Sequence, residues 1–186
     1  MRIIGGQWRG RRLFAPDGMD TRPTADRVRE ALFNIIRTDV YDAHIFDPFA
    51  GSGSLSLEAL SRGAAFSVMT DASRKAAAAI KRNIELCRAQ EQTRLIPSEW
   101  QAVIPSLRGQ KFSLVFLDPP YRLTAAYAEV PERLLRENML TDDALLVMEH
   151  SQEVTLPPLP PEFELYDTRR YGTVCLSLAR RRSVNE

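Results

Sequence analysis

The chain has 186 residues, of which 44% are hydrophobic and 26% charged, a composition typical of one globular domain with a modest extension. No apolar run is long enough to span a bilayer, and the N-terminal MRIIGGQWRGRR lacks the apolar segment of a signal peptide, so we expect a cytoplasmic protein. Two cysteines and two histidines leave no visible disulfide framework, metal-ligand cluster or Ser-His-Asp set. We expect a monomer, because no oligomer-forming helix or edge stands out.

Charge is distributed unevenly along the chain, although the formal net charge is only +1. Residues 1–37 carry eight arginines and four acids, and residues 168–182 carry five arginines and no acid, whereas the segment between them has 12 basic and 19 acidic residues. Because the planar guanidinium matches phosphate oxygens, these basic ends suggest a phosphate-rich partner at one edge of the domain. An arginine-rich composition without a binding role stays open as the alternative.

The predicted elements begin with a short hairpin over residues 1–14 and a helix over roughly 25–37, with Thr24 as its N-cap. Strands then alternate with helices, which indicates βαβ units and a mainly parallel sheet. The expected strands are 43–47, 66–70, 94–97, 112–117 and 144–150, and the expected helices are 54–63, 73–89, 100–107 and 124–137. A proline-rich connector (156–162) precedes two extended runs that meet at Tyr171-Gly172, which predict terminal antiparallel strands.

A small-residue loop, AGSGS at 50–54, follows the strand that ends at Asp47 and leads into a helix. Ligands of open α/β sheets bind beside such a turn, where glycines let a ligand approach backbone N–H groups. A P-loop would need Gly-Lys-Ser/Thr, and a dinucleotide fingerprint would need Gly or Ala where Ser56 stands. The pattern D-x-x-x-G-x-G of S-adenosylmethionine enzymes remains, beside the alternative of a purely structural turn.

Two further strand ends carry polar residues. Asp71 lies 18 residues after Gly53, near the spacing at which an acid binds a ribose hydroxyl pair. The alternative is that its charge complements the dipole of the next helix. After the third strand, Ser98 or Glu99 could contact the amine of an adenine and Trp100 could stack on its ring. A solvated helix start is an equally open interpretation there.

The strand 112–117 ends at Asp118-Pro119-Pro120-Tyr121. An exocyclic base amine is a poor nucleophile because its lone pair is delocalised, and acceptors on its N–H groups aim that lone pair at a methyl donor. The Asp118 carboxylate and the Pro119 carbonyl can be those acceptors, since prolines fix φ and hold the carbonyl rigidly. Tyr121 offers a face for a flipped-out base. A Pro-Pro turn with only a structural role is the alternative.

Nearly the whole chain resembles the bacterial small-subunit ribosomal RNA guanine-N2 methyltransferases of the RsmD family. The resemblance lies in RIIGGQWRGRRL, TRPTADRVREALFNII, DPFAGSGSLSLEALSRGA, FSLVFLDPPY, VMEHS and RRYGTVCLSL, of which the first two are the most specific. It implies a class I, Rossmann-like α/β methyltransferase domain over 38–186, with a seven-stranded sheet and helices on both faces, after a small extension over 1–37. It also implies methyl transfer from S-adenosylmethionine to guanine N2 in 16S rRNA, within the 30S subunit or an assembly intermediate, with S-adenosylhomocysteine as product.

The resemblance also assigns roles by position. The target-amine site is implied at Asp118, Pro119, Pro120 and Tyr121. Cofactor contacts are implied at Asp47, Phe49, Ala50, Gly51, Ser52, Gly53, Asp71, Ser98, Glu99 and Thr24, although the family usually shows Gly-Asp at positions 98 and 99. Our candidates for phosphate contact are Arg9, Arg11, Arg12, Arg22 and Arg27, followed by Arg170 and Tyr171.

Three alternatives remain at this point. Families that methylate a DNA adenine or cytosine amine, or a protein glutamine, usually carry Asn where Asp118 stands. A ribosome-assembly factor could keep the fold without catalysis. A dehydrogenase conflicts with Ser56 and with the Asp-Pro-Pro-Tyr motif, and tight NADH binding would support it.

Overall fold

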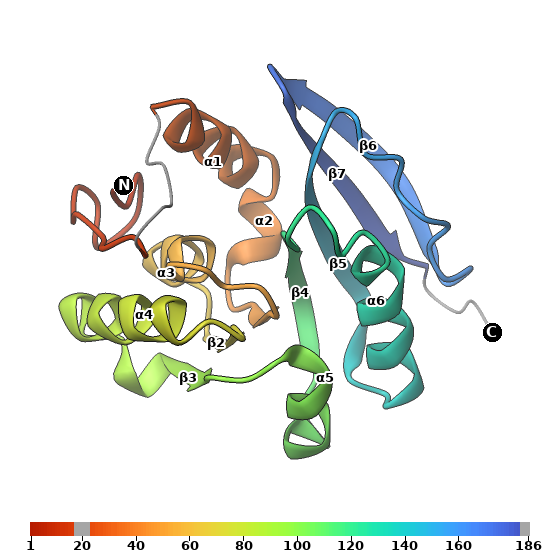
Figure 1. The fold of residues 1–186 in the computed structure, drawn as a ribbon, viewed down its shortest axis with the longest axis horizontal. Coiled ribbons are helices and arrows are strands. Elements are labelled where there is room, and N and C mark those ends of the chain that lie inside the picture. The colour runs from red at the N-terminus through yellow and green to blue at the C-terminus, as the bar shows by residue number, and fades with distance from the viewer. Residues whose placement is uncertain (17–22, 183–186) are drawn as a thin grey trace.

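The computed structural model describes residues 1–16 and 23–182. A seven-stranded sheet with the order β3-β2-β1-β4-β5-β7-β6 runs through the described chain (Figure 1). The strands are β1 (His44–Asp47), β2 (Phe66–Thr70), β3 (Thr93–Ile96), β4 (Phe112–Leu117), β5 (Leu140–Ser151), β6 (Phe163–Tyr171) and β7 (Val174–Arg181). Strands β1 to β5 pair in parallel, whereas β7 pairs antiparallel with both β5 and β6. The predicted seven-stranded, mainly parallel sheet is confirmed.

Helices fill the connections between the parallel strands. They are α1 (Pro23–Ile35), α2 (Arg37–Val40), α3 (Ser54–Ser61), α4 (Arg74–Cys87), α5 (Trp100–Val103) and α6 (Ala126–Arg136), with 3-10 turns at Gln90–Gln92 and Ile104–Leu107. As predicted, α6 continues through Pro131. No described helix is long and apolar enough to cross a membrane.

The predicted start of the first helix was wrong by two residues. Helix α1 begins at Pro23, so Thr24 lies inside the first turn and is not the N-cap. Proline is favoured at the first helical position because its missing N–H would have no helical partner there. The side chain of Thr24 and all of Arg22 lie outside the described part of the chain.

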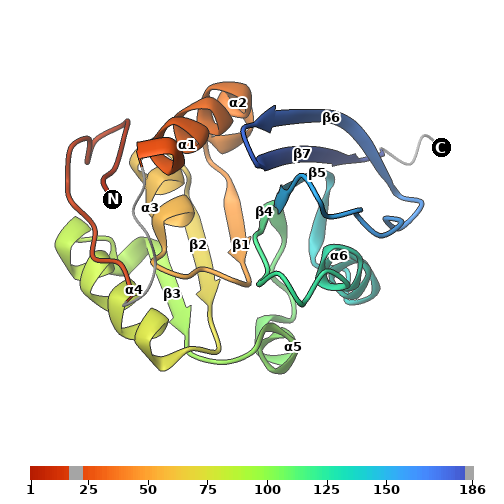
Figure 2. The same ribbon diagram turned by 45° about the horizontal axis from the view of Figure 1, so that its top comes forward.

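The two faces of the sheet are both apolar and both covered, as parallel sheets require. On β4, Leu114 and Phe116 pack in one core cluster with α1 to α4, whereas Val115 and Leu117 pack in a second cluster with α5 and α6. Figure 2 shows α1 and α6 on opposite sides of the strands. This arrangement confirms the predicted helices on both faces and leaves the strand ends free to form a site.

The first 14 residues double back on themselves without forming regular strands. One antiparallel bridge joins Arg2 and Arg12, and the Ile3 N–H donates to the Arg11 carbonyl at 2.9 Å. The predicted hairpin therefore exists only as this minimal pairing. Figure 1 shows the segment beside α3 and α4.

Buried Glu58 of α3 anchors this N-terminal segment. Its carboxylate accepts the backbone N–H groups of Ile4 and Gly5 at 2.8 and 2.9 Å, and Nε of Arg62 at 2.7 Å. Nε of buried Arg29, from α1, lies 3.7 Å from the same carboxylate. Burial lowers the pKa of Arg29, and the nearby carboxylates, Glu58 first, oppose that shift. Because a buried charge is costly without partners, these contacts hold the segment against α1 and α3.

Candidate active site at the carboxyl edge of the sheet

A cavity of about 730 Å³ opens at the carboxyl ends of the parallel strands. Its volume falls in the range of small-molecule sites, and its place is the one at which open α/β sheets bind ligands. Its walls combine residues from the ends of four strands with the start of α5. The predicted site residues among them are Phe49, Gly51, Asp71, Glu99, Asp118, Pro119, Pro120 and Tyr121. The structure thus brings together side chains that lie up to 72 positions apart in the sequence.

The glycine loop and Asp71 form one wall of the cavity. The Gly51 N–H donates to Oδ2 of Asp71 at 2.9 Å, and the Ser73 N–H donates to Oδ1 at 2.8 Å. A carboxylate offers about four acceptor positions, so about two remain for a ligand in the cavity. Asp71 therefore supports the start of α4 and also lines the cavity, while its contact with a ribose stays a prediction.

Gly53 turns the loop into α3. Its φ is 77°, and a Cβ there would lie 3.2 Å from Sδ of Met69, so both backbone conformation and packing favour glycine. The carbonyl of neighbouring Ser52 accepts from Nδ2 of Asn83 at 2.8 Å. Ala50 and Ser52 are buried, and they shape the loop from behind the cavity wall.

Asp47 is not among the described residues that line the cavity. Its Oδ2 accepts from Oγ of Ser56 at 2.7 Å, and Oγ of Ser67 donates to the Ser56 hydroxyl at 2.9 Å. All three side chains are buried. Burial raises the pKa of Asp47 to about 7, and the bond from Ser56 opposes the shift. Asp47 thus supports the strand-to-helix turn from inside the protein, and Ser56 links it to Ser67 in one buried hydrogen-bond chain.

The segment 118–121 lines another part of the cavity. Pro119 is buried, whereas Asp118 and Tyr121 are exposed, with 85% of the Tyr121 surface accessible. Asp118 lines the cavity, and the protein around it limits its contact with water. The resulting loss of solvent, and then the negative charge of Glu149, raise the pKa of Asp118 well above its ordinary value. This wall therefore offers a carboxyl group of raised proton affinity beside an open aromatic face.

The sequence predictions missed the end of β5. Glu149 and His150 line the same cavity, and the hydroxyl of Tyr127 donates to the Glu149 carbonyl at 2.6 Å. Nδ1 of His150 lies 2.9 Å from the Ser151 carbonyl, and its Nε2 lies 2.9 Å from Oγ of Ser177. The signal was present in the sequence, because VMEHS ends an apolar strand with an acid and a histidine at the edge where the other strands end.

Of the three residues after β3 that we expect to contact an adenine, only two line the cavity. Glu99 and Trp100 line it, whereas Ser98 is not among the described lining residues. Trp100 is only 6% exposed and packs in the second core cluster. Its ring therefore presents little free face for stacking.

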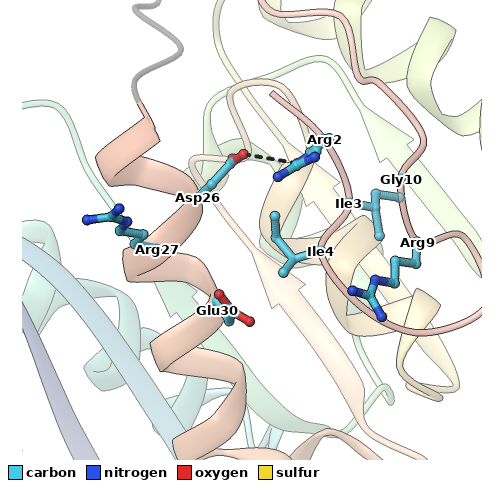
Figure 3. Close-up of a pocket in the computed structure, with 8 residues that line it drawn as sticks. All are labelled: Arg2, Ile3, Ile4, Arg9, Gly10, Asp26, Arg27 and Glu30. Carbon is cyan, nitrogen blue, oxygen red and sulfur yellow. Dashed lines mark ion pairs between the residues drawn. The ribbon is translucent and has the colours of Figure 1, made fainter.

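A second cavity, of about 440 Å³, lies between the N-terminal segment and α1 (Figure 3). It is lined by Arg2, Ile3, Ile4, Arg9, Gly10, Asp26, Arg27 and Glu30. Arg9 projects from the N-terminal segment and Arg27 from α1. No residue in the described ranges pairs with the side chains of Arg9, Arg12 or Arg27. In contrast, Nη1 of Arg11 donates to the Leu86 carbonyl at 2.7 Å and so helps to dock the segment.

The five arginines of residues 168–182 all have acceptors within the chain. Four face acids at 2.9 to 3.6 Å, in the pairs Arg169–Asp167, Arg180–Asp39, Arg181–Asp142 and Arg182–Glu164. Nε of Arg170 donates to the Gly172 carbonyl at 2.9 Å, and Tyr171 is half-buried against the first core cluster. The positive charge of this run is therefore largely matched by neighbouring carboxylates, which leaves the N-terminal arginines as the freer cations.

Solved structures share this architecture. The structure of yhhF from Escherichia coli is 36% identical, with a TM-score of 0.86 over 98% of both chains. An O-methyltransferase from Bacillus cereus is only 12% identical, but it matches with a TM-score of 0.67 over 89% of this chain and 84% of that one. The sheet order and these likenesses define the fold as that of the class I, Rossmann-like methyltransferases.

Sequence relatives narrow the assignment to one family. The family described as "Conserved hypothetical protein 95" matches residues 1–180. Ribosomal RNA small subunit methyltransferase D of Escherichia coli strain K12 is 38% identical over 100% of this chain and 92% of its own length. Its namesake in Haemophilus influenzae is 35% identical over 87% of this chain and 83% of its own length. The chain belongs to this family, the RsmD family.

Proposed function

We propose that this protein transfers a methyl group from S-adenosylmethionine to the exocyclic N2 amine of a guanine in 16S ribosomal RNA. One observation carries the proposal: Gly51 and Asp71, after β1 and β2, line the same cavity as the segment from Asp118 to Tyr121, after β4. The names of the relatives, ribosomal RNA small subunit methyltransferases, support ribosomal RNA as the substrate. We take the 30S particle or an assembly intermediate as the form in which that RNA is presented.

The wall formed by β1 and β2 fits the donor. Asp71 keeps acceptor positions for a pair of ribose hydroxyls, and the left-handed backbone at Gly51 and Gly53 lets a ligand approach the loop closely. Phe49 and Glu99 line the part of the wall that we assign to the adenine. When bound, S-adenosylmethionine supplies a methyl group already activated on a sulfonium, which leaves as a neutral thioether.

The wall formed by segment 118–121 fits the acceptor. The Asp118 carboxylate accepts one N–H of the guanine amine, and the carbonyl of rigid, buried Pro119 accepts the other. The nitrogen lone pair then forms the new bond to the methyl carbon as the carbon–sulfur bond breaks, and the nitrogen gives up one proton. Because its pKa is raised, Asp118 is suited to take that proton. The exposed face of Tyr121 stacks on the base.

The RNA backbone is held, in this proposal, by the N-terminal arginines. Arg9, Arg12 and Arg27 supply the phosphate contacts, since no described residue occupies their guanidinium groups. Arg11 acts indirectly, because its bond to the Leu86 carbonyl holds the segment in place.

Nucleoside mass spectrometry after incubation with S-adenosylmethionine tests the proposal. The substrates are unmodified 30S particles, naked 16S RNA and duplex DNA, and Asp118→Ala is assayed in parallel on each. We expect N2-methylguanosine in a ribosomal substrate and only with the unmutated protein. Methylated DNA, or no methylated product although S-adenosylhomocysteine binds, would refute the assignment.

A further inference from the structure

Glu149 is a charged residue of the cavity that the proposed chemistry does not use. It lies in the wall with Asp118, and it is half-buried. None of the described residues donates a hydrogen bond to its carboxylate or forms an ion pair with it. Burial raises its pKa, and the charge of Arg29 only partly opposes this. A half-buried carboxylate without a partner is costly, so its position calls for a ligand group that donates to it.

The pairing of β4 with β5 places Glu149 and Asp118 side by side, so both can contact the same ligand. Leu117 of β4 pairs with Met148 of β5 in parallel, so Asp118 and Glu149 occupy the next position on neighbouring strands. Successive side chains alternate between faces and neighbouring strands lie about 5 Å apart, so the two acids point the same way, side by side. The Coulomb effect of Glu149 on Asp118 agrees with this proximity.

The backbone that carries Glu149 is fixed on both sides. The Tyr127 hydroxyl holds the Glu149 carbonyl at 2.6 Å. His150 is held by the Ser151 carbonyl and the Ser177 hydroxyl, and its ring meets that of Tyr127 edge to face at 6.2 Å. A side chain on such a support presents its carboxylate in a defined direction, as a residue that reads a substrate must.

We propose that Glu149 selects guanine by accepting a hydrogen bond from its N1–H, next to the N2 amine that Asp118 accepts. This inference rests on the proposed function and names the residue that reads the base. Guanine presents N1–H and N2–H side by side on its Watson–Crick edge, which matches two adjacent carboxylates. Adenine presents a bare N1 acceptor there, which would face the Glu149 charge without a proton between them. The site therefore favours guanine through attraction at two atoms and rejects adenine through repulsion at one.

Replacing the target base by 2-aminopurine tests the proposal, because 2-aminopurine keeps the N2 amine and lacks the N1–H. The first step is to locate the guanine that the wild type methylates. We then ligate 16S RNA from fragments that carry either guanine or 2-aminopurine at that position, and reconstitute each RNA into particles. The readout is the ratio of kcat/KM on the two substrates. We expect wild type to prefer guanine by about tenfold to a hundredfold, the worth of one hydrogen bond to a charged group. In Glu149→Gln, whose amide can donate to the bare N1, we expect that preference to fall at least about tenfold.

The matched control is Glu153→Gln, the same change at an exposed acid that is not among the described lining residues of the cavity. It is expected to keep the wild-type preference, and binding of S-adenosylhomocysteine is expected to be equal in all three proteins. An equal loss of rate on both bases in Glu149→Gln, or an unchanged ratio, would overturn the inference and leave the proposed function standing. If wild type forms no N2-methylguanosine at all, the proposed function fails and the inference fails with it.

Discussion

Asp71, at the end of β2, accepts a hydrogen bond at 2.9 Å from the backbone N–H of Gly51, in the loop after β1. One carboxylate thus fixes the glycine loop and faces the cavity. The proposed donor site depends on this link between two strand ends.

Asp71→Asn is expected to weaken binding of S-adenosylhomocysteine by about tenfold to a hundredfold, because it removes the charge that strengthens these hydrogen bonds. Isothermal titration calorimetry measures the affinity directly. The matched control is Asp42→Asn, at an exposed residue with φ 58°, a conformation that asparagine tolerates. Equal affinities of the two variants would exclude Asp71 from donor binding.

Asp47→Asn is expected to change how stability depends on pH. The carboxyl group titrates near 3.8 in the unfolded chain and at about 7 in the folded protein, so folding favours its protonated form. Its contribution to the free energy of unfolding is therefore complete below pH 4 and is lost as pH rises to about 7. Asparagine can still accept a hydrogen bond from Ser56, and it cannot ionise. The variant therefore does not lose this part of the free energy of unfolding, which in wild type is on the order of a few kcal/mol above pH 7.

Thermal unfolding of both proteins between pH 4 and pH 8 checks this expectation. The melting temperature of Asp47→Asn minus that of wild type should increase steadily up to about pH 7, because all other titrating groups are common to both proteins. Any penalty for burying the new amide shifts the difference equally at every pH. A difference that stays constant with pH would contradict the raised pKa of Asp47.

Gly6→Ala is expected to detach the N-terminal segment from α3. Gly6 has φ 76°, and a Cβ there would lie 1.8 Å from the backbone oxygen of Ser61, a contact that only movement of the segment can relieve. Gly10→Ala is the matched control, because Gly10 has φ 85° and nothing within 4 Å of its Cβ position. Both variants carry backbone strain of about 1 kcal/mol from the positive φ. The difference between their effects therefore reports the collision of the new Cβ at position 6 with Ser61. Hydrogen exchange at Ile4 and Gly5 should increase much more in Gly6→Ala, and equal exchange would disprove this docking.

Arg9→Ala and Arg27→Ala are expected to weaken RNA binding and to reduce the slope of log affinity against log salt by about one unit each at most, because each removes one phosphate contact. The control is Arg169→Ala, whose side chain already pairs with Asp167 at 2.9 Å. Affinities for 16S RNA measured over a salt series report the slope. An Arg169 variant as defective as the other two would remove the distinction between free and paired arginines.

Much of the fold could be predicted because apolar periodicity and strand-ending residues are local signals. The strand at 66–70 was predicted to the residue, and the strand at 112–117 likewise. The start of α1 was misplaced because Thr24 looked like a cap, whereas the rigid φ of Pro23 suits the first helical position.

The site was harder to predict, because the order of strands in the sheet decides which strand-end side chains lie next to each other. Asp47 shares a pattern with ligand-binding acids, yet its hydrogen bond to Ser56 turns it into the core, and only the packing of α3 against β1 shows this. Glu149 lies in an apolar strand whose partner is β4, and its closeness to Asp118 follows from that pairing. The sequence of either strand alone does not show that Glu149 and Asp118 lie close together.

In the proposed function, Asp118 serves the methyl acceptor and has no part in holding the donor. Measuring single-turnover methyl transfer and S-adenosylhomocysteine affinity on wild type and Asp118→Ala separates these two roles. We predict that transfer falls by at least about a hundredfold, the usual worth of such a group, while affinity for the donor product stays within about twofold. A loss of affinity as large as the loss of transfer would instead place Asp118 in the donor site.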